Sequence, residues 1–343
     1  AVTPLGAGYN STKEPSVKPR QGMQGYRMST LATRAASLAL VLLAGCGAQT
    51  VLLGTSGGHL FVGYDQLVTP GEETVLEARL QSGDLLSDRP GHAVRFLLDG
   101  RLYGITLTDR EGMAQLPFTP QREMDYFFIA TPTATGFWSD PPSAVDVLVA
   151  CRRSDAPLLI VDIDWTLVES GFTQVLLGEP QPMPHSVPVM QRLAKEFCVV
   201  YLTHRPELFS PKSKLWLCRN GYPAGPVLLA DVEGFIKGSS GFKSARLAEL
   251  SEKFTNIRLG IGDLVTDVLA YRSVGAGGYL ILHPHLLEPE ELLDLARQVD
   301  ELPQAIQVVT GWDEIEQGIF EGRRFPPDRM AARLRELARS DAQ

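Results

Sequence analysis

The sequence predicts two domains in series, an all-β sandwich followed by an α/β domain built on a doubly wound parallel sheet. Two patterns indicate this order. Between residues 60 and 149, short runs that alternate apolar and polar residues recur between turn residues, which is typical of strands with one buried face. From Pro157 onward, aliphatic runs of strand length alternate with segments of helical periodicity, which predicts parallel strands joined by helices. The chain has 343 residues, 44% of them hydrophobic, so it is long enough to form two cores.

The first 45 residues are expected to lie outside both domains. Met28 begins a segment that contains Arg34, an apolar stretch over residues 35–43, and Leu43-Ala44-Gly45-Cys46. This segment resembles a bacterial lipoprotein signal peptide, which implies cleavage before Cys46 and attachment of lipid to its sulfur. The apolar stretch is too short to span a bilayer by itself. We therefore expect an exported protein, lipid-anchored to a bacterial membrane and facing the periplasm or the cell exterior. Residues 46–58 would be the tether, and a buried helix that ends in a cysteine is the alternative reading.

The net charge of the chain limits its possible partners, and its cysteine content limits the disulfides that it can form. Residues 1–45 carry five basic residues and one acidic residue, so their removal changes the formal charge from −8 to −12. An acidic chain without a run of Lys or Arg argues against a nucleic-acid partner. Beyond Cys46, Cys151, Cys198 and Cys218 remain, so at most one disulfide can form within the chain. Cys198 lies in an apolar run and is expected to be a small buried hydrophobe.

Residues 59–151 are predicted to form an immunoglobulin-like sandwich, because about seven short alternating runs fall in this stretch. Asp99-Gly100, between two of the runs, is a strong signal for a two-residue hairpin turn. The stretch Thr108–Ala114 is similar to a turn found in bacterial immunoglobulin-like repeats. This domain offers no chemical motif, so we expect it to be a spacer that lifts the α/β domain from the membrane.

Residues 155–325 are predicted to form the α/β domain. Five strands are expected, at residues 158–164, 197–203, 227–230, 257–263 and 279–283. Apolar spacing and capping residues indicate helices around residues 189–197, 210–221 and 247–254. Beyond the fifth strand we expect a helix over residues 286–299 and a strand over 306–309. A last helix, over 329–338, falls in the C-terminal segment 326–343. No function is assigned to these later elements.

Acidic residues stand where the first of these strands ends. Asp162 and Asp164 lie two positions apart, so their side chains leave the strand on the same side. Open α/β sheets bind ligands at this end of their strands. Two carboxylates so close together repel each other unless a cation or a shared proton compensates, which points to chemistry rather than packing.

The other predicted strand ends and the start of the third helix carry a hydroxyl, two cations and two carboxylates, namely Thr203, Arg205, Lys243, Asp263 and Asp267. Each also has a structural alternative, such as a helix cap, a turn or a surface ion pair. Lys237 is a nearby competitor of Lys243, and His204 is expected to be structural.

In this order the residues resemble the four motifs of the haloacid dehalogenase (HAD) superfamily of phosphohydrolases. Those motifs are Asp-x-Asp-x-Thr, a Ser or Thr at the second strand end, a Lys, and Gly-Asp-x-x-x-Asp. The resemblance implies a HAD-like Rossmannoid fold in which Asp162 attacks phosphorus and forms an aspartyl-phosphate. It implies that Asp164 acts as general acid and then as general base. Thr203 would bind the phosphoryl oxygens, and Lys243 would offset their negative charge.

The same resemblance implies a magnesium cofactor. Magnesium prefers hard oxygen ligands in octahedral geometry. Its ligands would be the carboxylate of Asp162, the main-chain carbonyl of Asp164, and Asp263. Asp267 would bind the ion directly or orient a water bound to it.

Within the superfamily, residues 158–271 resemble the lipin-type phosphatidate phosphatases and related actin-patch-associated enzymes. The shared segments are Tyr201-Leu202-Thr203-x-Arg205, Gly221-Tyr222-Pro223-x-Gly225-Pro226, Gly241-Phe242-Lys243 and Asp267-Val268-x-Ala270-Tyr271. The lipin pattern has Asp-Ile-Asp-Gly-Thr, and here Trp165 replaces the glycine. Trp165 and Arg205 are therefore the candidate substrate-binding residues.

The spacing of the motifs predicts a site without a lid domain. Only 38 residues separate Asp164 from Thr203, and 39 separate Thr203 from Lys243, which suffices for the sheet's own connections. An open site suits a phosphorylated lipid or another bulky phosphomonoester presented from outside. We therefore expect a magnesium-dependent phosphomonoesterase acting on phosphatidate-like lipid. The alternatives are a secreted acid phosphatase of broad specificity and a non-catalytic surface lipoprotein that binds phosphorylated ligands.

Overall fold

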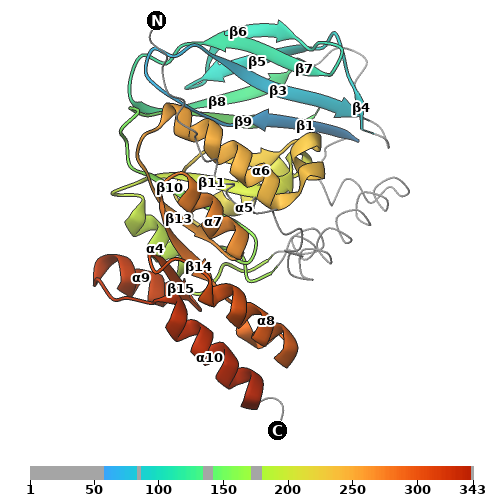
Figure 1. Cartoon of the computed structure of the whole chain (residues 1–343). Helices are drawn as coiled ribbons and strands as arrows, with labels where there is room; N and C mark the ends of the chain where they lie inside the picture. The colour runs from blue at the N-terminus through green and yellow to red at the C-terminus, as the bar shows by residue number, and fades with distance from the viewer. Residues whose placement is uncertain (1–57, 83–85, 134–141, 171–179, 341–343) are drawn as a thin grey trace, which may run out of the picture.

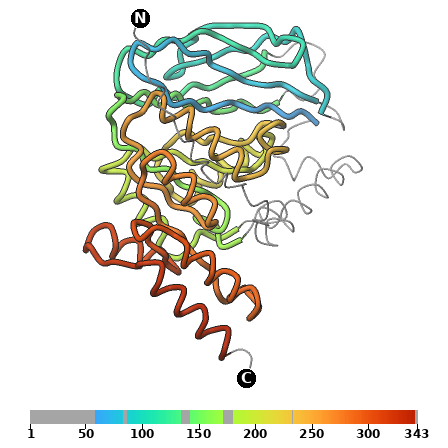
Figure 2. The backbone as a smooth tube through the Cα atoms, in the orientation of Figure 1, coloured from blue at the N-terminus to red at the C-terminus, as the bar shows by residue number. Residues whose placement is uncertain are grey.

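The computed structural model describes residues 58–82, 86–133, 142–170 and 180–340. Figure 1 shows a β-sandwich lying across one end of an α/β domain. The backbone trace in Figure 2 follows the chain from the sandwich to a pair of helices at the opposite end. The predicted signal segment and Cys46 lie outside the described residues. Among the described residues, no helix has the length and apolar character needed to cross a membrane.

The sandwich consists of two sheets whose apolar inner faces form one core. In the first sheet, β3 (Thr74–Ser82) pairs with β1 (His59–Tyr64), β4 (Ser87–Asp88) and β7 (Met113–Phe118). The second has the order β2 (Gln66–Val68), β9 (Val145–Cys151), β8 (Met124–Pro132), β5 (Ala93–Leu98) and β6 (Arg101–Leu107). All pairs are antiparallel except β2 with β9. This strand order confirms the predicted immunoglobulin-like sandwich.

Both turns that the sequence indicates in this domain are present. Asp99 and Gly100 have φ values of 50° and 73° and join β5 to β6, as a two-residue hairpin turn with two left-handed residues requires. In the second turn, Asp109 Oδ1 accepts hydrogen bonds from the main-chain N–H groups of Glu111 at 3.0 Å and Met113 at 2.8 Å.

The α/β domain contains a six-stranded parallel sheet. Its order is β12 (Val227–Ala230), β11 (Cys198–Pro206), β10 (Leu158–Val161), β13 (Ile257–Gly262), β14 (Gly277–Ile281) and β15 (Ile306–Val309). The strand order reverses at β10, which confirms the predicted doubly wound sheet. Open α/β sheets bind ligands beside such a point, outside the carboxyl ends of their strands.

Seven helices of the described chain cover the two faces of this sheet, and alternate residues of β10 point to each face. Leu158 and Ile160 belong to the cluster formed with α6 (Val232–Lys253), α7 (Val265–Ser273), α8 (Pro289–Asp300) and α10 (Pro327–Ser340). Leu159 and Val161 belong to the cluster formed with α4 (Ser186–Leu193), α5 (Ser210–Arg219) and α9 (Trp312–Phe320). Two short 3₁₀ turns, η1 (Glu207–Phe209) and η2 (Pro284–Leu286), complete the elements.

Several predicted boundaries were wrong for physical reasons. Strand β10 ends at Val161 rather than at residue 164, because the chain turns at Ile163, whose carbonyl accepts bonds from Thr166, Leu167 and Val168. Strand β14 begins at Gly277 and ends at Ile281, two residues before each predicted bound. Its start was missed because its first two residues are glycines, which carry no apolar signal. The predicted helix over 286–299 begins only at Pro289.

Helix α6 consists of two helical parts separated at Gly238, where φ is 80° and ψ is 164°. Lys243 lies near the start of the second part, close to the predicted start of the third helix. Helix α9 was not predicted at all. Cys151, Cys198 and Cys218 are free thiols, and Cys198 is half-buried against the core.

Candidate active site

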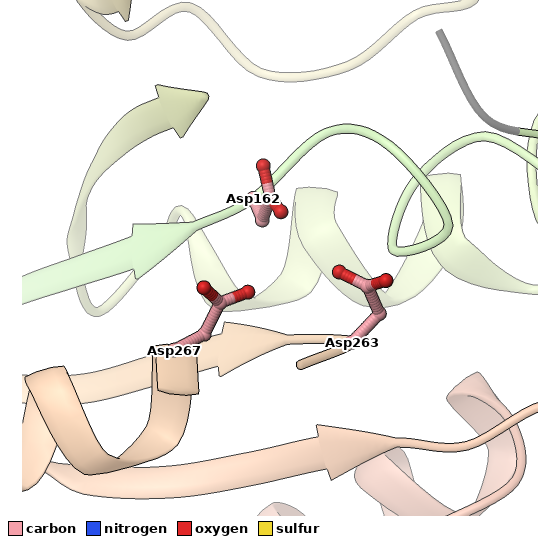
Figure 3. Close-up of side chains that lie close together, drawn as sticks. All are labelled: Asp162, Asp263 and Asp267. Atoms are coloured by element: carbon pink, nitrogen blue, oxygen red, sulfur yellow. The ribbon is translucent and has the colours of Figure 1, made fainter. Parts of the chain in front are cut away.

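Three carboxylates converge at the carboxyl ends of β10 and β13 (Figure 3). One oxygen each from Asp162, Asp263 and Asp267 lies within 4.8 Å of the others. Asp162 follows β10 directly, whereas Asp263 follows β13 and Asp267 lies in the first turn of α7. Residues that are about 100 positions apart in the sequence are therefore close enough to bind a single cation at ~2 Å per ligand bond.

Two glycines of β13 make room for this arrangement. A Cβ at Gly262 would lie 2.8 Å from Asp267 Oδ2, and a Cβ at Gly260 would lie 2.2 Å from the ring of Tyr271. Any side chain at either position would push α7 away from the strand. The Gly-x-Gly-Asp sequence therefore allows Asp267 to lie against the strand end.

Lys243 lies among these carboxylates. Its Nζ is 2.6 Å from Asp162 Oδ2 and 2.9 Å from Asp267 Oδ2, and its side chain is 1% exposed. Burial lowers the pKa of Lys243, but the charges of Asp162 and Asp267 outweigh burial, and the pKa lies well above its ordinary value. The competitor Lys237 instead forms an exposed ion pair with Glu233 at 2.8 Å. Of the two lysines, only Lys243 contacts the predicted site.

One ammonium group does not neutralise three carboxylates. Burial, with the charges of Asp267 and Asp164, raises the pKa of Asp162 to about 6 despite the opposing effect of Lys243. Burial also raises the pKa of Asp263 well above its ordinary value, and Asp162 and Asp267 add to the shift. Asp267 Oδ1 is buried and has no donor among the described residues, whereas Oδ2 has the ammonium of Lys243 at 2.9 Å. An excess of buried negative charge with an unsatisfied hard oxygen fits a divalent cation such as Mg²⁺.

Asp164 points to a different partner. Its two carboxylate oxygens accept hydrogen bonds from Arg205, at 2.9 Å from Nε and 2.8 Å from Nη2. Arg205 is 2% exposed, and its Nη1 donates to Ser213 Oγ in α5 at 3.0 Å. This bidentate pair fixes the direction of the Asp164 carboxylate. Asp164 is therefore not one of the three converging carboxylates, and metal binding through its main-chain carbonyl stays a prediction.

Thr203 and His204 lie near the end of β11. The Thr203 side chain is fully buried, and its Oγ1 accepts a hydrogen bond from the main-chain N–H of Arg205 at 3.3 Å. The ring of His204 stacks on Phe235 with 5.0 Å between the ring centres. Burial lowers the pKa of His204. His204 is thus part of the packing, and contact between Thr203 and a phosphoryl group stays a prediction.

Trp165 adopts a left-handed backbone conformation with φ of 54°. A residue with a side chain pays roughly 1–2 kcal/mol in this region, whereas glycine adopts it freely. The main-chain carbonyl of Trp165 accepts a hydrogen bond from His283 Nε2 at 2.7 Å, and the two rings lie 5.4 Å apart.

Sequence reasoning missed His283, Ser213 and Tyr271 as neighbours of the site. His283 follows β14 and therefore reaches the same edge of the sheet as Asp263. Its position at the end of a predicted strand was the available signal. Ser213 and Tyr271 lie on helices, and no spacing rule connects them with Arg205 or Lys243.

The comparison with protein families agrees with the location of this site. Residues 159–279, about a third of the chain, match the family model described as PITM 1-3, LNS2 domain. All the predicted catalytic and metal-binding residues fall inside this match. No curated protein matches the chain.

Similar solved structures include the titin M3 domain, at 14% identity and a TM-score of 0.21, covering 28% of this chain and 97% of that one. Another is the Pnkp1/Rnl/Hen1 RNA repair complex, at 15% identity and a TM-score of 0.34, covering 38% of this chain and 44% of that one. The D00-D0 domain of intimin has 15% identity and a TM-score of 0.21, covering 27% of this chain and 47% of that one. The family match and the strand order of the sheets indicate a lipin-like LNS2 domain with a HAD-like fold in the C-terminal part of the chain, after an immunoglobulin-like β-sandwich.

Proposed function

We propose that this protein is a magnesium-dependent phosphomonoesterase that forms an aspartyl-phosphate intermediate, with a phosphatidate-like lipid as its substrate. The observation that carries the proposal is the convergence of Asp162, Lys243, Asp263 and Asp267 at the switch point of the sheet. The match of this region to the LNS2 family supports it.

In the first half of the proposed reaction, a carboxylate oxygen of Asp162 attacks phosphorus, and the bond from phosphorus to the ester oxygen breaks. The leaving oxygen takes a proton from Asp164, which acts as a general acid. Arg205 gives one hydrogen bond to each oxygen of Asp164, so each oxygen keeps another lone pair for the proton it transfers.

In the second half, water attacks the phosphorus of the aspartyl-phosphate and gives a proton to Asp164. The bond from phosphorus to the Asp162 oxygen then breaks, which releases phosphate and restores both carboxyl groups. Lys243 keeps its positive charge throughout, because the carboxylates around it raise its pKa. Its ammonium lies 2.6 Å from Asp162 and offsets charge that develops there.

Asp162, Asp263 and Asp267 would hold the magnesium ion, which when bound supplies positive charge against the phosphoryl oxygens. Thr203, buried at the end of β11, would hydrogen-bond the same phosphoryl group. Trp165 would contact the rest of the substrate. Arg205, predicted as a second substrate contact, is buried and bonded to Asp164 and Ser213, so it would act on Asp164 instead.

Two observations support a bulky lipid substrate. The interval between Thr203 and Lys243 is filled by η1, α5, β12 and the beginning of α6, which leaves no separate lid domain there. The lipin-like character of residues 159–279 is the second. We also propose that lipid on Cys46 anchors the exported protein to a bacterial membrane, where such substrates lie. Loss of membrane association in Cys46→Ser would test the anchor.

Hydrolysis of p-nitrophenyl phosphate with added magnesium tests the chemistry. We expect turnover by the wild type and by Asp155→Asn, which changes an exposed carboxylate, and no turnover by Asp162→Asn. A protein that binds phosphate without turnover would be the surface binding lipoprotein. Phosphatidate in mixed micelles, compared with soluble nucleotides, tests the substrate. Equal or faster nucleotide hydrolysis would favour the acid phosphatase of broad specificity.

A further inference from the structure

We infer that the immunoglobulin-like sandwich positions Asp164 and is part of the catalytic unit, rather than only a spacer. This inference rests on the proposed function, because it takes Asp164 as the group that transfers protons. Its physical basis is a continuous series of polar contacts that begins in the sandwich, passes through α5 and Arg205, and ends on Asp164.

The series begins at Asp65, in the turn between β1 and β2. Its side chain is 3% exposed. Oδ1 accepts a hydrogen bond from the main-chain N–H of Leu148 at 2.8 Å and from Lys214 Nζ at 2.6 Å. Oδ2 accepts from the N–H of Val227, the first residue of β12, at 3.0 Å. One carboxylate of the sandwich is therefore bonded to both a helix and a strand of the α/β domain.

Lys214, on α5, directs all of its donors to the sandwich. An ammonium group has three donor hydrogens. Besides Asp65, Nζ lies 2.9 Å from the main-chain oxygen of Gly63 and 2.9 Å from that of Asp146. Gly63 itself is required here, because a Cβ would lie 2.6 Å from the oxygen of Asp146. The three acceptors fix the end of the Lys214 side chain in one place.

The preceding residue of α5 carries the contact to the catalytic group. Ser213 is 1% exposed, and its Oγ accepts a hydrogen bond from Arg205 Nη1 at 3.0 Å. Nε and Nη2 of Arg205 each donate to one oxygen of Asp164. A shift of α5 would therefore remove the Ser213 contact and allow the guanidinium to move together with the Asp164 carboxylate.

A second contact holds the same segment from its other side. Glu207 follows Arg205 by two residues, and its Oε1 accepts a hydrogen bond from Arg79 Nη1 of β3 at 2.9 Å. Arg79 is itself fixed by an ion pair with Asp88 at 3.0 Å. The segment that bears Arg205 is thus bonded to the sandwich both before and within α5.

The burial of the Lys214 contacts indicates that they fix the position of α5 and do not only hold the two domains together. Among the described residues, Lys253 and Glu72 form a further ion pair between the domains, with side chains 49% and 23% exposed. The side chains of Lys214 and Asp65 are only 15% and 3% exposed. Buried ion pairs contribute little net stability because both charges lose water, but they tolerate only one geometry. The buried contacts involve α5, which also contacts Arg205, whereas the more exposed pair involves Lys253 at the end of α6.

The test compares two substrates of similar size in the full-length protein. Phenyl phosphate has a poor leaving group that needs a proton from the general acid, whereas p-nitrophenyl phosphate has a good one that does not. Because kcat/KM reports the reaction only up to the first irreversible step, the ratio of the two kcat/KM values measures general-acid catalysis. A merely structural loss of folded enzyme lowers both values equally and leaves the ratio unchanged.

We expect Lys214→Met to lower the phenyl to p-nitrophenyl ratio by about tenfold, in the same direction as Asp164→Asn. Lys214→Arg should restore part of it. Glu72→Gln, which breaks the exposed contact between the domains, should keep the wild-type ratio. If Lys214→Met does not fold, Ser213→Ala removes only the hydroxyl that Arg205 contacts and should lower the ratio as well.

A wild-type ratio in folded Lys214→Met, or in folded Ser213→Ala, would overturn the inference while leaving the proposed phosphatase intact. An unchanged ratio in Asp164→Asn, or activity in Asp162→Asn, would instead contradict the proposed mechanism itself.

Discussion

A single ammonium group stands between two of the converging carboxylates, and the chain supplies that charge from a buried position. Lys243 contacts Asp162 and Asp267, while Lys237, six residues earlier and before the break at Gly238, pairs with Glu233 in solvent. The two lysines therefore form a matched pair, one within the site and one outside it. Trp165, in contrast, adopts a left-handed backbone conformation, which is unfavourable for a residue that carries a side chain.

Replacing Lys243 with methionine should reduce kcat/KM by about 10²–10³-fold, the usual cost of losing one charge-stabilising group. It should also destabilise the protein by about 3–5 kcal/mol, because two buried carboxylates lose their cation. Lys237→Met should change stability by less than about 0.5 kcal/mol. Phosphatase assays and urea unfolding of both variants give these values. Equal activity in the two variants would show that Lys243 takes no part in the reaction.

At Trp165 we expect glycine to be more stabilising than alanine, although alanine is the better choice in ordinary backbone. Alanine keeps the left-handed strain and loses the ring, whereas glycine relieves about 1 kcal/mol of strain. Urea unfolding of Trp165→Gly and Trp165→Ala measures the difference. A more stable alanine variant would mean that the positive φ carries no strain.

At the scale of elements, the sequence could predict the sheet and the residues that follow its strands, because neighbouring parallel strands end at the same edge. The buried run of β10 and the strand–helix alternation predicted the sheet, and parallel strands bring Asp162, Asp263 and Asp267 to one edge. The contact of Arg205 with Asp164 could not be read in the same way, because it depends on a side chain that turns back across the strand end. The helical part of α6 before Gly238 was not predicted either, because it is short and carries no clear apolar period.

The acidic edge of the sheet should also make the stability of the protein depend on pH and magnesium. The pKa of Asp162 rises from 3.8 to about 6 on folding, so the folded chain holds this proton more tightly than the unfolded chain. The contribution of this group to the free energy of unfolding without metal therefore decreases as pH rises through this range. Protons and magnesium compete for the same oxygens, so the rise in Tm caused by magnesium should be larger at about pH 7.5 than at about pH 5.

Thermal unfolding with and without magnesium at the two pH values tests this expectation. Asp162→Asn should weaken the magnesium effect and reduce its dependence on pH. A magnesium shift that is the same at both pH values would argue against binding by these carboxylates.

At the scale of the whole molecule, the two domains share a hydrophobic core. Leu67, Leu148 and Ala150 of the sandwich belong to the same buried cluster as Leu158 and Ile160 of β10. Buried apolar contacts and buried charged contacts both cross this boundary. The contact between the domains is therefore more extensive than in two domains joined only by a flexible linker. The sequence placed one domain after the other but carried no signal for this contact, because the residues involved read as ordinary strand residues.

The shared core predicts that the sandwich and the α/β domain unfold together. Far-UV circular dichroism reports both domains, whereas in a Trp138→Phe background the fluorescence of Trp165, Trp216 and Trp312 reports the α/β domain. In urea, the two signals should follow one transition in the wild type. Two separate transitions would contradict the prediction, and Lys214→Met should move the two signals apart or shift the single transition to lower urea.

The turn that carries Asp65 has a practical consequence for anyone who recombines this chain. An expression fragment beginning near residue 152 would leave Lys214 without any of its three oxygen acceptors and would uncover apolar residues that Leu67 and Leu148 now shield. A chimera that fuses residues 152–340 to a foreign carrier should therefore aggregate or misfold. One that also imports the β1–β2 turn and β9 would retain its native surroundings.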